Sequence, residues 1–194
     1  MLRDLRPALV SVVLFTLALG LAYPLAMTGL AGAVFPHQAG GSLLRDARGE
    51  VIGSSLIAQG FARPEYLHPR PSAAGNGYDP MNSGGSNLGP LDKKLIDRVA
   101  GDAKTIGALE GSPAIPVDAL TTSASGLDPD VSPENARTQA RRLAGQRGVD
   151  VSIIQSVIDA NTRRPMLGIL GEPAVNALAV NRALDDRFPV AHPR

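Results

Sequence analysis

Residues 7–36 read PALVSVVLFTLALGLAYPLAMTGLAGAVFP, a stretch without a charged side chain that lies between Arg6 and His37. As an α-helix this stretch would be about 45 Å long. The hydrocarbon core of a bilayer is only about 30 Å thick, so the stretch can cross it and project beyond. We therefore expect a transmembrane helix and its extension over residues 7–35, which tether the rest of the chain to a membrane.

The basic residues before this stretch predict its orientation. Arg3 and Arg6 lie close to the span, and Lys and Arg near a first span favour the cytoplasmic side. We expect a single-pass membrane protein, with residues 1–6 in the cytoplasm and residues 36–194 outside, in the periplasm or its equivalent. A cleaved signal peptide ending at Ala31-Gly32-Ala33 is the alternative, but its apolar core would be only about 7–15 residues long.

Small residues recur at helical spacing within the span and predict a packing face. Such residues allow a second membrane helix to approach closely. The alternative is that Ala and Gly are simply common in apolar spans. Tyr23-Pro24 interrupts the same stretch, and proline removes a backbone donor and usually kinks a helix. The candidate packing residues are Ala18, Ala22, Ala26, Gly29 and Ala33.

The composition of the remaining chain excludes several classes of function. After Arg6 the chain carries 17 basic and 17 acidic residues, so it offers no electrostatic footprint for nucleic acid. It contains no cysteine, which excludes disulfides and thiolate metal sites. It also lacks tryptophan and has few other aromatic residues, so no base-stacking platform is available.

The order of local signals after the span predicts an α+β fold. Residues 42–46 and 50–53 flank Ala47-Arg48-Gly49, a loop length typical of a β-hairpin. Residues 60–88 are rich in Pro, Gly, Asn and Ser and form a long connection, which is more often functional or disordered than a simple linker. We expect one N-terminal transmembrane helix followed by a single mixed α/β extracytoplasmic domain.

Helix starts are predicted where a capping residue or a proline precedes an apolar pattern. Gly89-Pro90 would open a helix whose apolar side includes Leu91 and Leu95. Ser132-Pro133 would open a second helix that ends at Gly148. The two remaining predicted starts are Asp150 and Glu172-Pro173.

A search for catalytic motifs finds little. No Gly-Lys-[Ser/Thr] phosphate loop and no G-x-S-x-G nucleophile turn is present. The imidazoles are His37, His68 and His192, and a Ser–His–Asp triad would have to use His68. We expect no catalytic residue, although a membrane-anchored periplasmic hydrolase stays open as an alternative function.

Two weaker binding patterns have simpler interpretations. Ser83-Gly84-Gly85-Ser86-Asn87 could cradle an anion with backbone amides, but we favour a Gly/Ser turn before a helix as the interpretation. Asp118, Asp128 and Asp130 could bind Ca²⁺, but their spacing is not that of an EF-hand. Acids that precede a helix are also electrostatically favoured there. We expect no metal site and no solute pocket, because no aromatic pocket is available.

Ordered motifs along nearly the whole chain carry a family resemblance. With these segments the chain resembles the C subunit (KdpC) of the bacterial Kdp potassium-transporting P-type ATPases. Ala58, Leu67, Leu120, Thr122 and Ala124 depart from the family pattern without changing the order or spacing of the motifs. The segments are Arg6-Pro7-Ala8-Leu9, Tyr23-Pro24-Leu25, Gly41-Ser42-Leu43, Arg70-Pro71-Ser72-Ala73, Gly85-Ser86-Asn87-Leu88-Gly89-Pro90, Ser125-Gly126-Leu127-Asp128-Pro129 and Gly171-Glu172-Pro173 with Val175-Asn176.

The resemblance implies an accessory subunit of a potassium-uptake complex. Its partners would be a channel-like K⁺-translocating subunit, a P-type ATP-hydrolysing subunit and the lipid bilayer. The family is described as supporting assembly and raising the ATP affinity of the pump subunit, so ATP binding is a family expectation, while ATP and K⁺ are used by the complex. No cofactor is expected to be bound directly, since the cytoplasmic segment is so short.

The matching loops are the candidate docking sites for these partners. The loop at 123–129 is small and polar, with Leu127 as its single large apolar side chain. Leu127 would anchor a partner or tuck beneath its own loop, and we expect Asp128 to have a local structural role. The candidate docking residues are Arg70, Pro71, Ser72, Ser86, Asn87, Leu88, Ser123, Ser125, Gly126, Leu127, Asp128 and Pro129.

Overall fold

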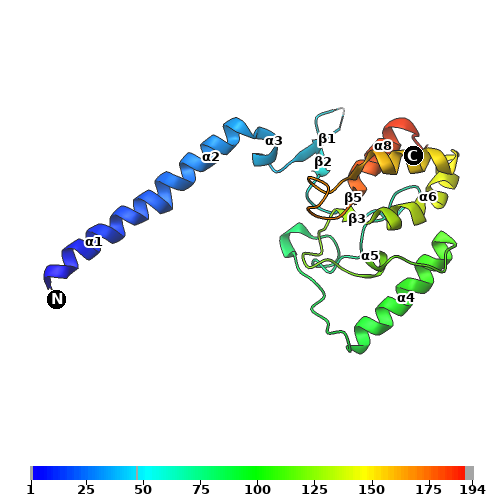
Figure 1. Cartoon of the computed structure of the whole chain (residues 1–194), viewed down its shortest axis with the longest axis horizontal. Helices are drawn as coiled ribbons and strands as arrows, with labels where there is room; N and C mark the ends of the chain where they lie inside the picture. The colour runs from blue at the N-terminus through cyan, green and yellow to red at the C-terminus, as the bar shows by residue number, and fades with distance from the viewer. Residues whose placement is uncertain (1, 47, 191–194) are drawn as a thin grey trace. The chain divides into compact units, whose positions relative to one another are not determined.

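The computed structural model describes residues 2–46 and 48–190, which divide into two compact units (Figure 1). The first unit ends at Ser54 and the second begins at Ser55. The expected boundary at residue 36 would place only the N-terminal segment and the apolar helix in the first part of the chain, and the hairpin in the second. In the structure the β-hairpin that follows the helix belongs to the first unit, and the second unit contains the mixed α/β fold.

A single continuous helix forms the N-terminal part of the first unit. It consists of α1 (Leu2–Leu17), a π-helical turn (Ala18–Ala22) and α2 (Tyr23–Val34). Residues Arg3–Val34 are long and apolar enough to cross a membrane, and the 18-residue window that qualifies is not buried by the rest of the chain. The helix starts before Pro7, so both Arg3 and Arg6 lie on its first turns.

The π-helical turn explains how proline is tolerated in the span. Pro24 has no N–H, and its ring would collide with the carbonyl four residues earlier, that of Gly20. The turn before it widens, and the Tyr23 N–H bonds to the Ala18 carbonyl five residues back. The irregularity expected at Tyr23-Pro24 is thus a widened turn within an unbroken helix.

The predicted hairpin is confirmed. After α3 (Pro36–Ala39), strands β1 (Leu43–Arg45) and β2 (Val51–Ser54) pair antiparallel, with a register shift between Leu44 and Arg45. The Asp46 carboxylate organises the turn by accepting the N–H groups of Arg48 and Glu50, both at 2.9 Å. Ala47 of the predicted loop lies outside the described residues.

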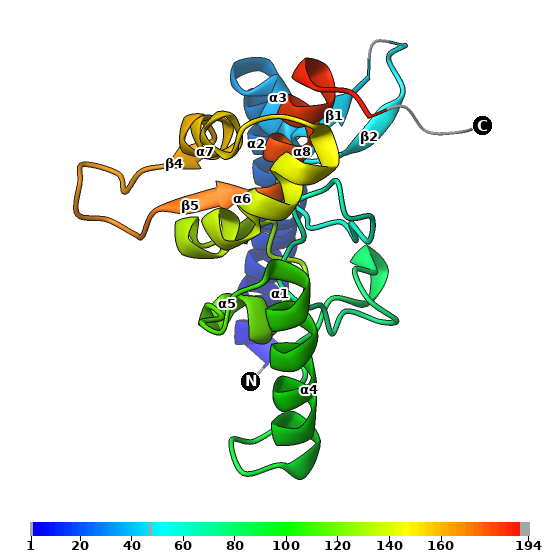
Figure 2. The same ribbon diagram turned by 90° about the vertical axis from the view of Figure 1, so that its right-hand side faces the viewer.

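The second unit is built from helices around a small antiparallel sheet (Figure 2). Its sheet has the order β3-β5-β4, with β3 (Asp130–Val131), β4 (Thr162–Arg163) and β5 (Ala174–Asn176). Helices α6 (Pro133–Arg147), α7 (Val151–Ala160) and α8 (Ala177–Arg187) supply most of the core. The buried cluster contains Leu67, Val131, Ala136, Ala140, Leu143, Ala144, Ile154, Val157, Ile158, Val175, Ala177, Val180 and Leu184.

Two predicted helix starts are confirmed. In both, the capping side chain bonds an amide only two or three residues further along the chain. The Ser132 hydroxyl accepts the Asn135 N–H at 3.0 Å and caps α6, which ends at Gly148 with a left-handed φ of 64°. The Asp150 carboxylate accepts the Ser152 N–H at 2.8 Å and caps α7.

Two other predicted starts are wrong. Helix α4 (Lys93–Glu110) begins after Asp92, whose carboxylate caps the Lys94 N–H, so Leu91 precedes the helix and is 91% exposed. Helix α8 begins after Asn176, because residues 174–176 pair with β3 and β4 instead of extending the helix back to Glu172-Pro173. In each case a capping side chain lies closer to the helix than the proline does. A short helix, α5 (Val117–Leu120), lies between α4 and β3.

Side-chain amides hold the long connection against the helices. The buried Asn181 of α8 accepts the Leu67 N–H at 2.7 Å and donates to the Leu67 carbonyl at 3.0 Å. Gln139 of α6 does the same for His68, at 2.8 and 3.0 Å. The two side chains take the place of a neighbouring β-strand, because buried backbone groups need partners.

Two arginines extend this support along the same segment. The Arg142 guanidinium donates to the carbonyls of Pro64 and Tyr66, and its Nε forms a buried ion pair with Glu110 at 2.8 Å. Arg147 donates to the Glu65 carbonyl at 3.0 Å. The long connection is therefore an ordered part of the fold rather than a disordered linker.

We predict that Asn181→Ala destabilises the second unit. The substitution leaves the buried N–H and C=O of Leu67 unpaired, at about 1–3 kcal/mol each. Thermal unfolding of the full chain in detergent should show a melting temperature lower by roughly 10 °C. Asn76→Ala, on an exposed turn, is the matched control and should change the melting temperature little. Equal melting temperatures for the wild type and Asn181→Ala would contradict the backbone-pairing role.

Candidate docking surface formed by three loops

Three loops that carry the predicted docking residues meet in the second unit. They are residues 70–78, 83–88 and 121–129, here called the three-loop surface. Hydrogen bonds join them directly: the Gly84 N–H donates to the Ser125 carbonyl at 2.8 Å, and the Ser72 side-chain hydroxyl donates to the Gly126 carbonyl at 2.7 Å. Segments up to 58 residues apart in the sequence thus form one surface.

Arg70 links the first loop to the third. Its Nη1 lies 3.0 Å from Asp128 Oδ2, and its Nε lies 3.4 Å from the Thr121 carbonyl oxygen. Both members of the ion pair are partly exposed, so the pair contributes modestly to stability. Its main effect is geometric, because the planar guanidinium fixes the two loops at one distance.

Ser72 and Tyr78 fix the turn of the first loop. The Ser72 hydroxyl oxygen accepts the N–H groups of Ala74 and Tyr78, at 3.1 and 2.8 Å. The Tyr78 hydroxyl in turn donates to the Arg70 carbonyl at 2.8 Å. Burial raises the pKa of Tyr78 above its ordinary value, so the hydroxyl remains a proton donor at neutral pH.

Gly126 of the third loop lies close to the backbone of both other loops. Its φ is 67°, which disfavours residues with a side chain. A Cβ at this position would lie 2.6 Å from the Gly84 carbonyl oxygen and 2.7 Å from the Ala74 nitrogen. The three-loop surface therefore requires glycine for both backbone conformation and space.

The structure separates the two open roles of the third loop. Leu127 is only 9% exposed, so its side chain is buried, which favours the tucked arrangement over an exposed anchor. The Asp128 carboxylate accepts the Asp130 N–H at 3.1 Å in addition to its pair with Arg70. These contacts support the local structural role expected for Asp128.

The other docking residues differ in how they are held. Pro71, Ser86, Leu88, Ser123 and Pro129 are partly exposed, whereas Asn87 and Ser125 are exposed. Asn87 has a left-handed φ of 52°, a conformation that asparagine tolerates better than most residues. The five predicted packing residues belong to the other unit, where Ala18, Ala22, Ala26, Gly29 and Ala33 are all exposed along the helix.

The alternative catalytic centre at His68 gains no support. A ring nitrogen of His68 lies 3.1 Å from the Arg63 carbonyl oxygen, so Nε2 is the donor. Burial, with repulsion from Arg142, lowers the pKa of His68 and keeps its ring neutral. Among the hydrogen bonds of residues 2–46 and 48–190, none joins this ring to a serine or a carboxylate. His192 lies outside the described residues.

The three candidate calcium ligands are engaged by protein donors. Asp118 accepts the N–H and hydroxyl of Ser132 at 2.7 and 2.9 Å. Asp128 pairs with Arg70, and Asp130 pairs with Arg163 at 2.6 Å. Over the described part of the chain, no group of three potential metal-binding side chains comes together.

Sequence reasoning missed the role of the side chains that hold the segment leading into this surface. Gln139, Arg142, Arg147 and Asn181 lie on helices and bind the backbone of the long connection. Polar residues within apolar helical patterns were the available signal, since a buried amide or guanidinium needs a partner.

We predict that Gly126→Ala disrupts the three-loop surface. The added methyl group meets backbone atoms that cannot rotate away, which should cost about 3 kcal/mol or more. Gly111→Ala is the matched control, because Gly111 has a φ of 62° but a Cβ added there would meet no atom within 4 Å. Chemical denaturation of both full-length variants should show a much larger loss of stability for Gly126→Ala. Similar losses of stability in the two variants would mean that the left-handed backbone conformation, and not the close contacts of Gly126, explains the effect.

Comparison with known proteins gives a consistent result over the whole chain. A family model described as KdpC, the c chain of K⁺-transporting ATPase, matches residues 5–186. The potassium-transporting ATPase KdpC subunit of Caulobacter vibrioides strain NA1000 is 61% identical over 189 residues, which are 97% of this chain and 96% of the relative. The subunits of that name from Rhodospirillum rubrum and Beijerinckia indica are 53% and 51% identical, over 99% and 100% of this chain and 100% and 98% of the relatives.

The resemblance inferred from the ordered motifs is therefore confirmed. The match includes both the apolar helix and the three loops, so it is not limited to the membrane segment. The chain belongs to the KdpC family and is a subunit of a K⁺-transporting ATPase.

Proposed function

We propose that this chain is a non-catalytic accessory subunit that supports the assembly and stability of a high-affinity potassium-uptake complex. The observation that carries the proposal is that one chain of this family contains both an exposed apolar helix and a hydrogen-bonded network of loops. The helix needs lipid or other helices around it. The three-loop surface offers shape and backbone polarity, the features of a docking surface.

The partners in this proposal are a channel-like K⁺-translocating subunit and a P-type ATP-hydrolysing subunit. The curated relatives are named potassium-transporting ATPase subunits, which supports a complex with both activities. We place Ala18, Ala22, Ala26, Gly29 and Ala33 against a membrane helix of one partner. The three-loop surface would contact the part of a partner that lies outside the bilayer.

The effect on ATP use belongs to the same proposal. We propose that the subunit raises the ATP affinity of the pump subunit indirectly, by stabilising the conformation that binds ATP. With the main domain in the periplasm, that domain lies on the opposite side of the membrane from cytoplasmic ATP, so its effect on ATP affinity is indirect. ATP and K⁺ are then ligands of the complex and not of this chain alone.

We predict that residues 1–6 lie in the cytoplasm and the second unit in the periplasm of the inner membrane. Arg3 and Arg6 precede the span, and basic residues there favour the cytoplasmic side. A C-terminal fusion to a phosphatase that is active only in the periplasm should therefore be active. A fusion at the same site that is active only in the cytoplasm is the control, and its activity would contradict the proposed orientation.

We also predict that Ala22→Leu weakens the complex more than Leu19→Phe does. Bulk at Ala22 would keep a partner helix from approaching, whereas position 19 already carries a large side chain, so Leu19→Phe adds little bulk. Affinity purification of the tagged chain in mild detergent, with the partner subunits coexpressed, measures the amount of partner retained. Equal retention by the two variants would remove the argument for a packing face.

A further inference from the structure

An apolar hairpin tip projects from the second unit and has no role in the fold described so far. Residues 164–173 connect β4 to β5, and Figure 2 shows this connection extending beyond α6 and α7. Outside the N-terminal helix, no other five consecutive described residues expose four large apolar side chains. These are Met166, Leu167, Ile169 and Leu170, exposed by 66%, 83%, 80% and 53%.

The backbone of the tip is held in one conformation. Met166 and Leu170 exchange two backbone hydrogen bonds, each 3.0 Å long, and the Gly168 N–H donates to the Pro165 carbonyl at 3.1 Å. At the base of the hairpin, Thr162 pairs with Val175, which is fully buried in the core. A backbone that is already fixed loses little conformational entropy when it binds, so the backbone of this tip is preorganised for contact.

Leu167 occupies a position that the turn itself would not select. Its φ is 56° and that of Gly168 is 77°, an arrangement in which Asn, Asp or Gly is preferred before Gly. A large side chain in the left-handed region costs conformational energy, and such costs concentrate at functional positions. The leucine side chain therefore serves something other than turn formation.

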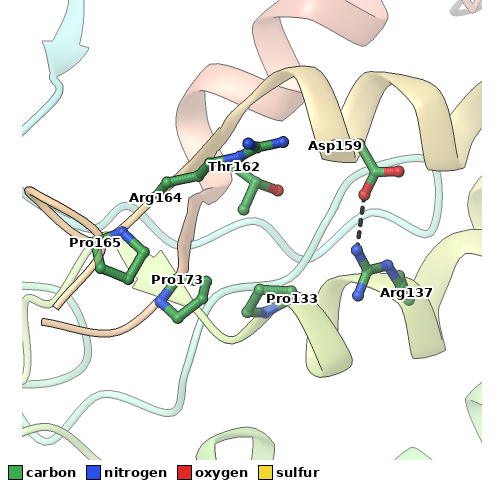
Figure 3. A pocket seen from close by; sticks show the side chains of 8 residues that line it. Pro133, Arg137, Asp159, Thr162, Arg164, Pro165 and Pro173 are labelled. Atoms are coloured by element: carbon green, nitrogen blue, oxygen red, sulfur yellow. Dashed lines mark hydrogen bonds and ion pairs between the residues drawn. The ribbon is translucent and has the colours of Figure 1, made fainter.

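The base of the hairpin adds a positive charge beside a cavity. The cavity has a volume of about 700 Å³ and is lined by Pro133, Arg137, Arg164, Pro165 and Pro173, among others (Figure 3). Arg137 pairs with Asp159 at 2.8 Å. Within residues 2–46 and 48–190, by contrast, Arg164 forms no ion pair. An acidic group on a binding partner would complement this guanidinium.

These features fit a shaped protein surface better than a lipid surface. The tip contains no Trp or Tyr, which typically anchor a segment at a membrane interface. Fluid lipid adapts to any shape, so a fixed, strained turn gives no advantage in binding it. A recess of defined shape on a protein, by contrast, binds best to a turn whose shape is already fixed. We propose that residues 164–170 dock the second unit into an apolar recess, bordered by a carboxylate, on another subunit of the same ATPase. This inference rests on the proposed accessory role.

Copurification of the tagged full-length chain with coexpressed partner subunits tests the docking element. Leu167→Asp with Ile169→Asp should reduce partner retention by roughly tenfold or more, since buried anchors dominate interface energies. Arg164→Glu should also reduce retention. Leu91→Asp is the control, because Leu91 is an even more exposed leucine on a different loop, and it should retain the partners. Since the changed side chains are exposed, all variants should keep wild-type melting temperatures within a few degrees.

The outcomes separate this inference from the accessory role. A wild-type chain that retains no partner would overturn the accessory role itself. Full retention by the tip variants would overturn only the hairpin inference.

A fluorescent label distinguishes a protein recess from other occupants. The chain has no cysteine, so Ile169→Cys gives a single labelling site for an environment-sensitive dye. In proteoliposomes of neutral and anionic phospholipid, the emission should shift to the blue only when the partner subunits are present. A blue shift without partners would overturn the proposal in favour of lipid. Disulfide-linked dimers of the unlabelled variant would overturn it in favour of a second copy of this chain.

Discussion

The second unit depends on one constraint, which is that a long connection without a strand partner must have its buried backbone groups satisfied. Asn181 and Gln139 meet this constraint by pairing both polar groups of Leu67 and of His68. Because each amide has one donor side and one acceptor side, it can replace a strand over a single residue. Helices α6 and α8 thereby fix the path of a segment that local sequence preferences would leave undetermined.

The position of the three-loop surface follows from that path. Once Leu67 and His68 are fixed, the residues that follow them lie beside the third loop. There Arg70 pairs with Asp128, and the Ser72 hydroxyl donates to the Gly126 carbonyl. The position of the three-loop surface thus depends on contacts made in the core, at Leu67 and His68. Partly exposed contacts such as the Arg70 pair contribute little free energy individually, but they are anchored to buried elements that contribute much more.

Local signals predicted some of this structure and long-range contacts decided the rest. The caps at Ser132 and Asp150 could be read from the sequence because each bonds an amide two or three residues away. The start of α8 could not, because pairing of Val175 with two strands outweighed the proline at 173. The docking loops were found through family motifs, but their meeting could not be predicted, since Gly126 contacts residues that are more than forty positions away. The apolar run at 166–170 was missed because exposure cannot be distinguished from burial by hydrophobicity alone.

The amide pairing also sets the order of events during synthesis. Leu67 and Asn181 are separated by 114 positions, so the backbone of Leu67 has no permanent partner until α8 has been made. At ordinary rates of translation this interval is on the order of ten seconds. During it, the segment at Leu67 lacks both its backbone partner and the α8 side chains that complete the core around it. The path of the connection around Leu67 can therefore be fixed only after α8, near the end of the second unit, has been synthesised.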